Sequence, residues 1–400
     1  MGSRDRAVPE RTAQLAMAAL HGIPAERVHQ QPWPRWLITA TPDDDVVLYS
    51  PWTRAGTVAA TAAAARGGPM DRRGFLFATG TTLAAVGAHW AATTTAGGEP
   101  PAATGRRLSP GTVTRLEQRL DDLRRLDDVL GGAELRPLAV AEFDLISGLA
   151  DHATYDAACG RRLFTALAEA ARLAGWLHFD ADRHGSAQTF YITALRAAAT
   201  AGDEATGANV LAFLAIQTYS VGNPQDAVNL VRTAQAHARH ATPRVRSMLH
   251  ARAARALSKT GDRTGCAREL DAARTTYAAG AHDDDPAWSY WMSDGEIEML
   301  AASSALDLGD PRRALVHFDA ARAAAYAADG YVRDNALYLA RAAGAHLDLG
   351  DLDAACTTAT QALEHSVDSA RPTGALTDLR RRLLPHRRAT AVRDFLDRSA

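Results

Sequence analysis

One pentapeptide, Leu-Asp-Leu-Gly-Asp, occurs at residues 306–310 and again at 347–351. Each copy ends one Ala/Leu-rich stretch and begins another, and looser versions of the same turn contain Gly222 and Gly261. The four turn glycines are therefore separated by 39, 48 and 41 residues. A spacing in this range, with a helical stretch on each side of the turn, is typical of a solenoid built from helix pairs. It predicts a concave surface that holds a partner, and it disfavours a catalytic cleft.

Helix pairs can be placed around these turns, together with helices on both sides of the array. The expected positions are 110–130 and about 136–150, then the pairs 161–178 with 184–200, 204–220 with 224–239, 243–259 with 264–278, 286–307 with 311–327 and 331–348 with 352–367, and finally terminal helices over 373–398. Pro224 and Pro311 suit the first position of a helix, where no N–H is needed. Asp310 and Asp351 suit the N-cap position. The expected fold class is all-α, a helical solenoid with an irregular N-terminal segment.

The N-terminal part lacks this periodicity. Its expected elements are a helix at 12–20, an irregular Trp- and Pro-rich segment at 31–55, an Ala-rich helix at 56–66, an apolar run from Phe75 to Trp90, and a small-residue linker at 91–105.

The apolar run follows an arginine pair, Arg72-Arg73. Such a pair before a weakly apolar stretch is typical of a twin-arginine export signal, and a chain starting at Met70 would fit that interpretation. Against it, sixty-nine residues precede Met70, and residues 91–98 contain no clear Ala-x-Ala cleavage site. The favoured interpretation is a buried helix with a basic N-terminal flank. The run is also too short, and too rich in Thr and Gly, to span a membrane.

Several motifs carry a resemblance to known families. In the last pair, Tyr338, Leu347, Gly350 and Asp351 are followed by Ala354 and Ala355, an order that resembles tetratricopeptide repeats. The whole series resembles a family of actinobacterial regulators, which join an N-terminal helix-turn-helix of the Xre type to a C-terminal tetratricopeptide array. The motifs that carry this second resemblance are residues 32–37, 51–58, 71–76, 175–180, 207–211, 285–288 and 331–339.

The resemblance covers nearly the whole chain and implies three segments. Residues 1–69 would hold a remnant of the DNA-binding domain and a Trp/Pro-rich linker, residues 70–105 the twin-arginine-like helix and linker, and residues 106–400 the repeat array. Family members carry the twin-arginine stretch between their two parts, which favours the buried-helix interpretation. Residues 11–28 resemble only the last helix of an Xre-type domain, and the recognition helix has no counterpart. DNA binding therefore stays open, and so does a homodimer.

Other functional classes find little support in the sequence. The net charge is −2, so no global basic field points to nucleic acid. The chain contains no phosphate-binding loop, no GxSxG and no HExxH, so neither an enzyme nor a cofactor is expected. His237 and His240 lack further ligands at metal-binding spacing. The three widely separated cysteines are expected to be free thiols in a reducing compartment.

The first helix of each pair is expected to line the concave face. Polar and aromatic side chains on these helices are therefore the candidate contacts, namely Asn209, Gln217, Arg252, Arg255, Trp288, Trp291, Asn335 and Tyr338. The asparagines could hold a peptide backbone through two-sided hydrogen bonds. The alternative for each residue is plain helix surface or packing between repeats, and for the two tryptophans it is the core.

Three hypotheses follow. The first is a cytoplasmic regulator whose array binds a peptide or protein partner, with no membrane contact and a link to transcription that rests on the resemblance. The second is an exported repeat protein that starts at Met70 and acts outside the cytoplasm. The third, least favoured, is an enzyme with an unfamiliar site in the groove.

Overall fold

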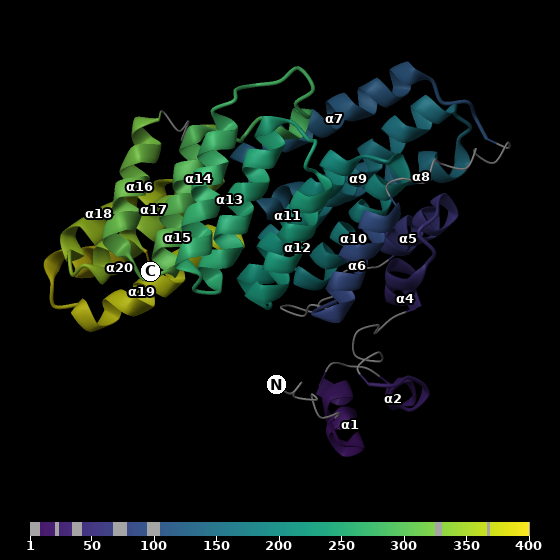
Figure 1. Ribbon diagram of the computed structural model, residues 1–400. Helices are drawn as coiled ribbons and strands as arrows, with labels where there is room; N and C mark the ends of the chain where they lie inside the picture. The colour runs from purple at the N-terminus through teal and green to yellow at the C-terminus, as the bar shows by residue number, and fades with distance from the viewer. Residues whose placement is uncertain are drawn as a thin grey trace.

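The computed structural model describes residues 9–20, 24–33, 42–66, 78–93, 105–324, 330–365 and 369–399. Across these ranges the chain is helical, and it contains no strand apart from an isolated bridge between Arg107 and Thr154. Consecutive helices pack on one another along the chain in the manner of a solenoid (Figure 1). The predicted all-α fold class is confirmed.

The array consists of helix pairs close to the predicted positions. They are α9 (Ala157–Asp180) with α10 (His184–Ala201), α11 (Glu204–Val221) with α12 (Pro224–His237), α13 (Pro243–Lys259) with α14 (Arg263–Tyr277), α15 (Asp294–Asp307) with α16 (Pro311–Ala323), and α17 (Val332–Asp348) with α18 (Leu352–Glu364). Flanking elements are α7 (Pro110–Val129) and α8 (Gly132–His152) before the array, and α19 (Ala370–Leu383), η3 (Leu384–His386) and α20 (Thr390–Arg398) after it.

The repeated pentapeptide forms the turn inside the last two pairs. Gly309 and Gly350 have φ of +73° and +80°, a region that residues with a Cβ rarely adopt. Asp310 then accepts the backbone N–H of Arg313 at 3.1 Å, and Asp351 accepts that of Ala354 at 3.0 Å. One residue therefore ends the first helix and the next caps the second, which explains why Gly and Asp recur together.

The fourth pair differs from its prediction at its start. Residues 286–293 do not belong to the long helix, because only the short 3-10 turn η1 (Ala287–Ser289) forms there and α15 begins at Asp294. The hydroxyl of Ser293 accepts the backbone N–H of Glu296 at 3.1 Å and so defines a new N-cap. Trp288 and Trp291 consequently lie in the segment before α15.

The N-terminal segment contains more helix than predicted. Helices α4 (Pro42–Tyr49), α5 (Arg54–Arg66) and α6 (Thr81–Thr93) pack against α10, and α6 also packs against α12. The pair α1 (Arg11–Leu20) and α2 (Ala25–Gln30) lies apart from the array in Figure 1. The expectation of an irregular segment at 31–55 was therefore wrong over α4.

A buried arginine explains why α4 forms. The guanidinium of Arg196, on α10, donates to the carbonyl oxygens of Val47 at 2.7 Å, Leu48 at 2.8 Å and Ser50 at 3.0 Å. These carbonyls lie at the C-terminal end of α4, where a helix leaves its acceptors unpaired. The guanidinium also lies 4.6 Å from the ring centre of Trp52. The partner that stabilises α4 is thus about 150 residues away in the sequence.

The described part of the apolar run includes α6, which buries one face against the array and exposes the other, so the predicted buried helix is buried only in part. Trp90 of α6 is fully buried, and a Cβ atom at Gly207 of α11 would lie only 2.2 Å from its indole nitrogen. Glycine at 207 therefore allows α6 to approach α11. Arg72 and Arg73 lie outside the described residues. Within the described ranges, no helix combines the length and the apolar character needed to cross a membrane.

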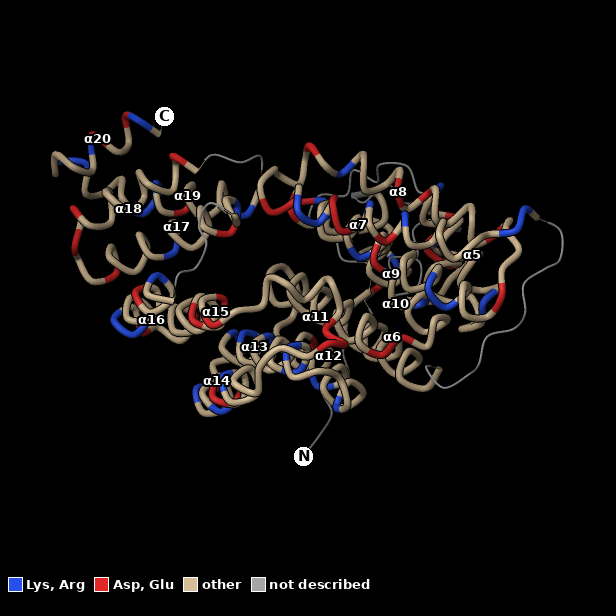
Figure 2. Tube along the Cα trace, turned by 90° about the horizontal axis from the view of Figure 1, so that it is seen from above, with Lys and Arg blue, Asp and Glu red and all other residues tan. Residues whose placement is uncertain are grey.

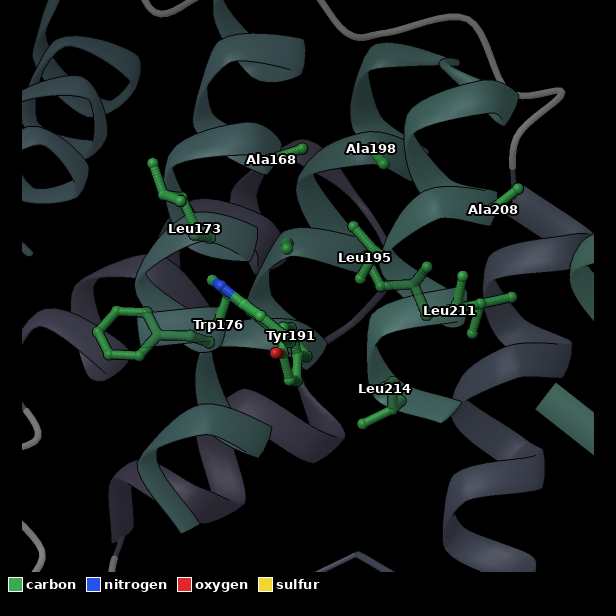
Figure 3. Packing of buried hydrophobic residues seen from close by; sticks show 14 of the residues in the cluster. Ala168, Leu173, Trp176, Tyr191, Leu195, Ala198, Ala208, Leu211 and Leu214 are labelled. Atoms are coloured by element: carbon green, nitrogen blue, oxygen red, sulfur yellow. The ribbon is translucent and has the colours of Figure 1, made fainter. Parts of the chain in front are cut away.

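The core of the array depends on small residues. Figure 3 shows Ala168, Ala198 and Ala208 among the leucines of α9, α10 and α11. Tyr191 is fully buried beside Gly175, where a Cβ would lie 2.8 Å from the tyrosine ring. Close packing of this kind fixes the spacing of neighbouring helices, and with it the shape of the surface they enclose.

Candidate functional site

A cavity lies on the inner side of the array. Seen from above, helices α7, α11, α15 and α17 are arranged around the same region of the molecule (Figure 2). Side chains from these helices, from α9, α13 and α19, and from the segment around η1 line a cavity. Its volume is about 110 Å³, and it is partly open to solvent, so a bound ligand could extend beyond it.

The cavity is closed by contact between α7 and α17, which are distant in the sequence. Arg333 forms an ion pair with Asp127, donates to the carbonyl oxygen of Asp127 at 3.1 Å, and lies 3.4 Å from the carboxylate of Asp334. Burial alone would lower the pKa of Arg333, but the carboxylates of Asp127 and Asp334 raise it well above its ordinary value. The two helices are therefore joined by a buried charge pair.

Aromatic rings make up much of the lining. They are Trp176, Phe213, Tyr219, Trp288, Tyr290, Trp291, Tyr331 and Tyr338. Guanidinium groups lie over several of them, with Arg172 at 4.6 Å from the ring centre of Phe213 and Arg252 at 5.1 Å from that of Trp291. Such contacts hold an arginine in place without neutralising its charge.

Two carboxyl groups in the lining titrate near neutral pH. Glu296 is buried and accepts the hydroxyl of Tyr338 at 3.1 Å, and burial raises its pKa to about 7. Asp128 accepts the hydroxyl of Tyr290 at 2.5 Å, and burial raises its pKa to about 7 as well. The cavity therefore becomes more negative as the pH rises through neutrality.

Four side-chain atoms of the lining residues are buried without a hydrogen-bond partner. Two are the guanidinium Nε atoms of Arg124 and Arg333, whose other nitrogens form ion pairs. The other two are the side-chain oxygen of Asn209 and the indole nitrogen of Trp288, in residues that are 1% and 5% exposed. A buried polar atom of this kind costs free energy until a partner is supplied, and most such atoms in folded proteins have one. A ligand with peptide-like donors and acceptors could supply partners for the Asn209 oxygen and the Trp288 nitrogen.

Six of the eight predicted contact residues line this cavity. They are Asn209, Arg252, Arg255, Trp288, Trp291 and Tyr338. Trp288 also belongs to the main core cluster, and Trp291 packs against that cluster. Both tryptophans are therefore core residues and cavity-lining residues at the same time. That these residues bind a ligand stays a prediction.

Gln217 and Asn335 lie outside the cavity because other contacts hold them. The amide of Gln217 donates to the carbonyl oxygen of His184 at 2.7 Å, which ties α11 to α10. The amide nitrogen of Asn335 lies 3.1 Å from the imidazole of His365. Both side chains are buried, and both therefore serve packing between helices.

Sequence reasoning missed much of the charged lining. Arg341 lies three residues after Tyr338 on α17, a spacing that places both on one face of a helix, so the pattern could have revealed it. Asp127 and Asp128 belong to α7, outside the predicted repeats, and nothing local connects them to α17.

Within the ranges that the structure describes, no three His, Cys, Asp or Glu side chains are grouped to hold a metal ion. His237 instead packs on Trp90, with ring centres 5.3 Å apart. Comparison of the chain with models of protein families, with curated proteins and with solved structures found no match.

Proposed function

We propose that this chain is a regulator-like protein that holds a peptide, or an extended segment of a protein partner, in the cavity of its helical array. The carrying observation is the cavity lining, which combines aromatic rings with buried polar atoms without partners, among them those of Asn209 and Trp288. Aromatic surfaces with a few fixed polar groups are typical of ligand sites. Tetratricopeptide-like repeats and a role in transcriptional regulation are part of the proposal, and they rest on the sequence resemblance.

A cytoplasmic location also belongs to this proposal. Its support is the packing of α5 and α6, whose residues share one core cluster with the array. Export with cleavage near 91–98 would remove both helices and uncover the surface around Gly207. N-terminal sequencing of the native protein tests this point. A chain that begins near residue 95 would favour the exported alternative.

Peptide retention tests the binding function. The purified chain is mixed with a randomised pool of short synthetic peptides, and retained peptides are identified by mass spectrometry after size exclusion. We expect a defined subset to be retained. Asn209→Ala and Trp291→Ala should reduce that retention at least tenfold, because both side chains line the cavity.

A matched control is available on the outer side of the array. Val316 of α16 is 65% exposed and does not line the cavity, so Val316→Ala should retain the same peptides as the wild type. Circular dichroism checks that each variant is folded. Retention of no peptide, or equal retention by the cavity variants and the wild type, would contradict the proposed function.

A further inference from the structure

A second cavity lies beside the first, along α7, α9 and the start of α11, and the segment around η1 completes its lining. Its volume is about 440 Å³, its accessible surface is mostly apolar, and it is partly open to solvent. Arg124 and Trp288 line both cavities. A volume of this size is typical of sites that hold a small molecule.

The segment between α14 and α15 forms one wall of the second cavity because it is held against α7. It extends to α7 in Figure 1, and η1 contacts that helix. The hydroxyl of Tyr290 donates to the carboxylate of Asp128 at 2.5 Å, and the guanidinium of Arg125 lies 3.5 Å from the centre of the Tyr290 ring. Pro286 and Ala287, which line the cavity, belong to this same segment. The fold therefore builds the wall through defined contacts.

Acidic side chains outnumber basic ones in the lining of the second cavity. Four carboxylates and one guanidinium line it, namely those of Glu117, Asp121, Glu169, Asp203 and Arg124. Three of the four carboxylates form ion pairs with arginines. The pairs are Glu117 with Arg162 at 2.6 Å, Asp121 with Arg124 at 3.0 Å, and Glu169 with Arg124 and Arg172 at 3.1 and 3.3 Å.

Asp203 differs from the other three carboxylates. It accepts the hydroxyl of Thr165 at 3.0 Å, and it accepts both the hydroxyl and the backbone N–H of Thr206 at 2.9 Å. All three donors are neutral, and among the residues that the structure describes no basic side chain lies within 4.0 Å of this carboxylate. The N-terminus of α11 offsets only part of its charge. The carboxylate is therefore held in position without a counter-ion.

Two hydrogen-bond donors in the lining give an independent sign of a ligand. The Nε atom of Arg124 and the indole nitrogen of Trp288 are buried without a partner, in residues that are 8% and 5% exposed. A buried donor without an acceptor costs free energy, which a ligand oxygen would recover. Since both residues line both cavities, an acceptor on either side could serve them.

We propose that the second cavity binds a small organic cation, in which an ammonium group is joined to an apolar body that carries an acceptor oxygen. The ammonium group pairs with Asp203, through charge-assisted hydrogen bonds that are stronger than neutral ones. The apolar body lies on the surface to which Leu120 and Ala166 contribute. The oxygen accepts from Arg124 or Trp288. This inference goes beyond the proposed function and does not depend on peptide binding in the first cavity.

Three probes with one common body test the proposed charge selectivity. They are para-methoxyphenethylamine, which carries an ammonium group, the neutral para-methoxyphenethyl alcohol, and para-methoxyphenylpropionate, which carries a carboxylate. Isothermal titration calorimetry with the full chain measures their affinities. We expect the amine to bind about tenfold more tightly than the alcohol, and the propionate to bind more weakly than the alcohol. The preference for the amine should weaken in high salt, since the cavity is partly open to solvent.

An amide at position 203 assigns the effect to the carboxylate. Asp203→Asn should reduce the affinity for the amine to that for the alcohol, because it removes the charge. It should leave the fold intact, because asparagine caps a helix as well as aspartate does. Asp310→Asn makes the same change at the N-cap of α16, outside the second cavity, and should bind the amine as the wild type does. Circular dichroism checks that both variants are folded.

Three results would overturn the proposal. They are no binding of the amine by the wild type, equal affinity of the wild type for all three probes, and an unchanged preference for the amine in folded Asp203→Asn. Peptide retention in the first cavity is measured separately, so each of these results leaves the proposed function as it stands.

Discussion

Replacing Glu296 by Gln should remove a large part of the pH dependence of stability. The carboxyl is buried beside Tyr338, and burial raises its pKa from the ordinary 4.5 to about 7. An acid with a raised pKa binds more protons in the folded than in the unfolded chain between those two values. The stability of the wild type therefore falls as the pH rises from about 4.5 to about 7, and the loss persists above that range.

The size of the effect follows from the two pKa values. A pKa difference of one unit between the folded and unfolded chain corresponds to about 1.4 kcal/mol, so ionisation of Glu296 costs the folded state about 3 kcal/mol above pH 7. Glutamine has nearly the same shape, still accepts from the Tyr338 hydroxyl, and cannot ionise. The unfolding free energy of Glu296→Gln minus that of the wild type should therefore be about 3 kcal/mol larger at pH 8 than at pH 4.5.

Urea unfolding at both pH values, followed by circular dichroism at 222 nm, measures this difference. Asp128 also titrates near pH 7, but it is present in both proteins and cancels from the comparison. Glu364→Gln, an exposed position at the end of α18, should follow the wild type at both pH values. If Glu296→Gln and the wild type lose stability in parallel between pH 4.5 and 8, the assignment of a buried, largely neutral carboxyl is refuted.

Three further substitutions test the packing. Arg333→Met should lower the unfolding free energy by about 3–5 kcal/mol, because Asp127 is left buried without its partner. Adding Asp127→Leu to the same chain should restore much of the lost stability, as measured by urea unfolding. Gly207→Ala should lower the unfolding free energy by about 1–3 kcal/mol, because the added methyl group would overpack against Trp90. In a Trp90→Ala background, thermal unfolding should show a much smaller loss from the same substitution. Equal losses in the two backgrounds would refute the contact. Asp351→Ala should cost about 1 kcal/mol through the lost N-cap, and an unchanged urea midpoint would contradict that role.

The sequence could reveal the array because its signals are local. A left-handed Gly350 followed by the N-cap Asp351 is a pattern within a few residues, and it marks a turn wherever it occurs. The start of α15 was harder to predict. The segment at 286–293 is as apolar and aromatic as a helix, and only the capping hydroxyl of Ser293 places the start of the helix after it.

The cavity could be predicted only in part. Helical spacing placed Asn209, Arg252 and Tyr338 on first helices, and these three side chains line it. No local pattern relates Asp127 to Arg333, because their pairing depends on the curvature of the array that the intervening helices form. The ion pairs of Arg255 with Asp307 and of Arg371 with Asp334 are likewise contacts between separate helices, which composition and periodicity do not encode.

The contact of α7 with α17 also sets the order in which the protein can be assembled. Asp127 and Arg333 are separated by 206 positions, and at about 5–20 residues per second a ribosome needs roughly 10–40 s to make that interval. During this time the earlier helix pairs can fold on their neighbours, while the inner surface still lacks the wall formed by α17 and α19. At that stage the nascent chain exposes the aromatic rings and arginines of its inner surface. The cavity is enclosed only after the segment that carries Arg333 and Arg341 has been made.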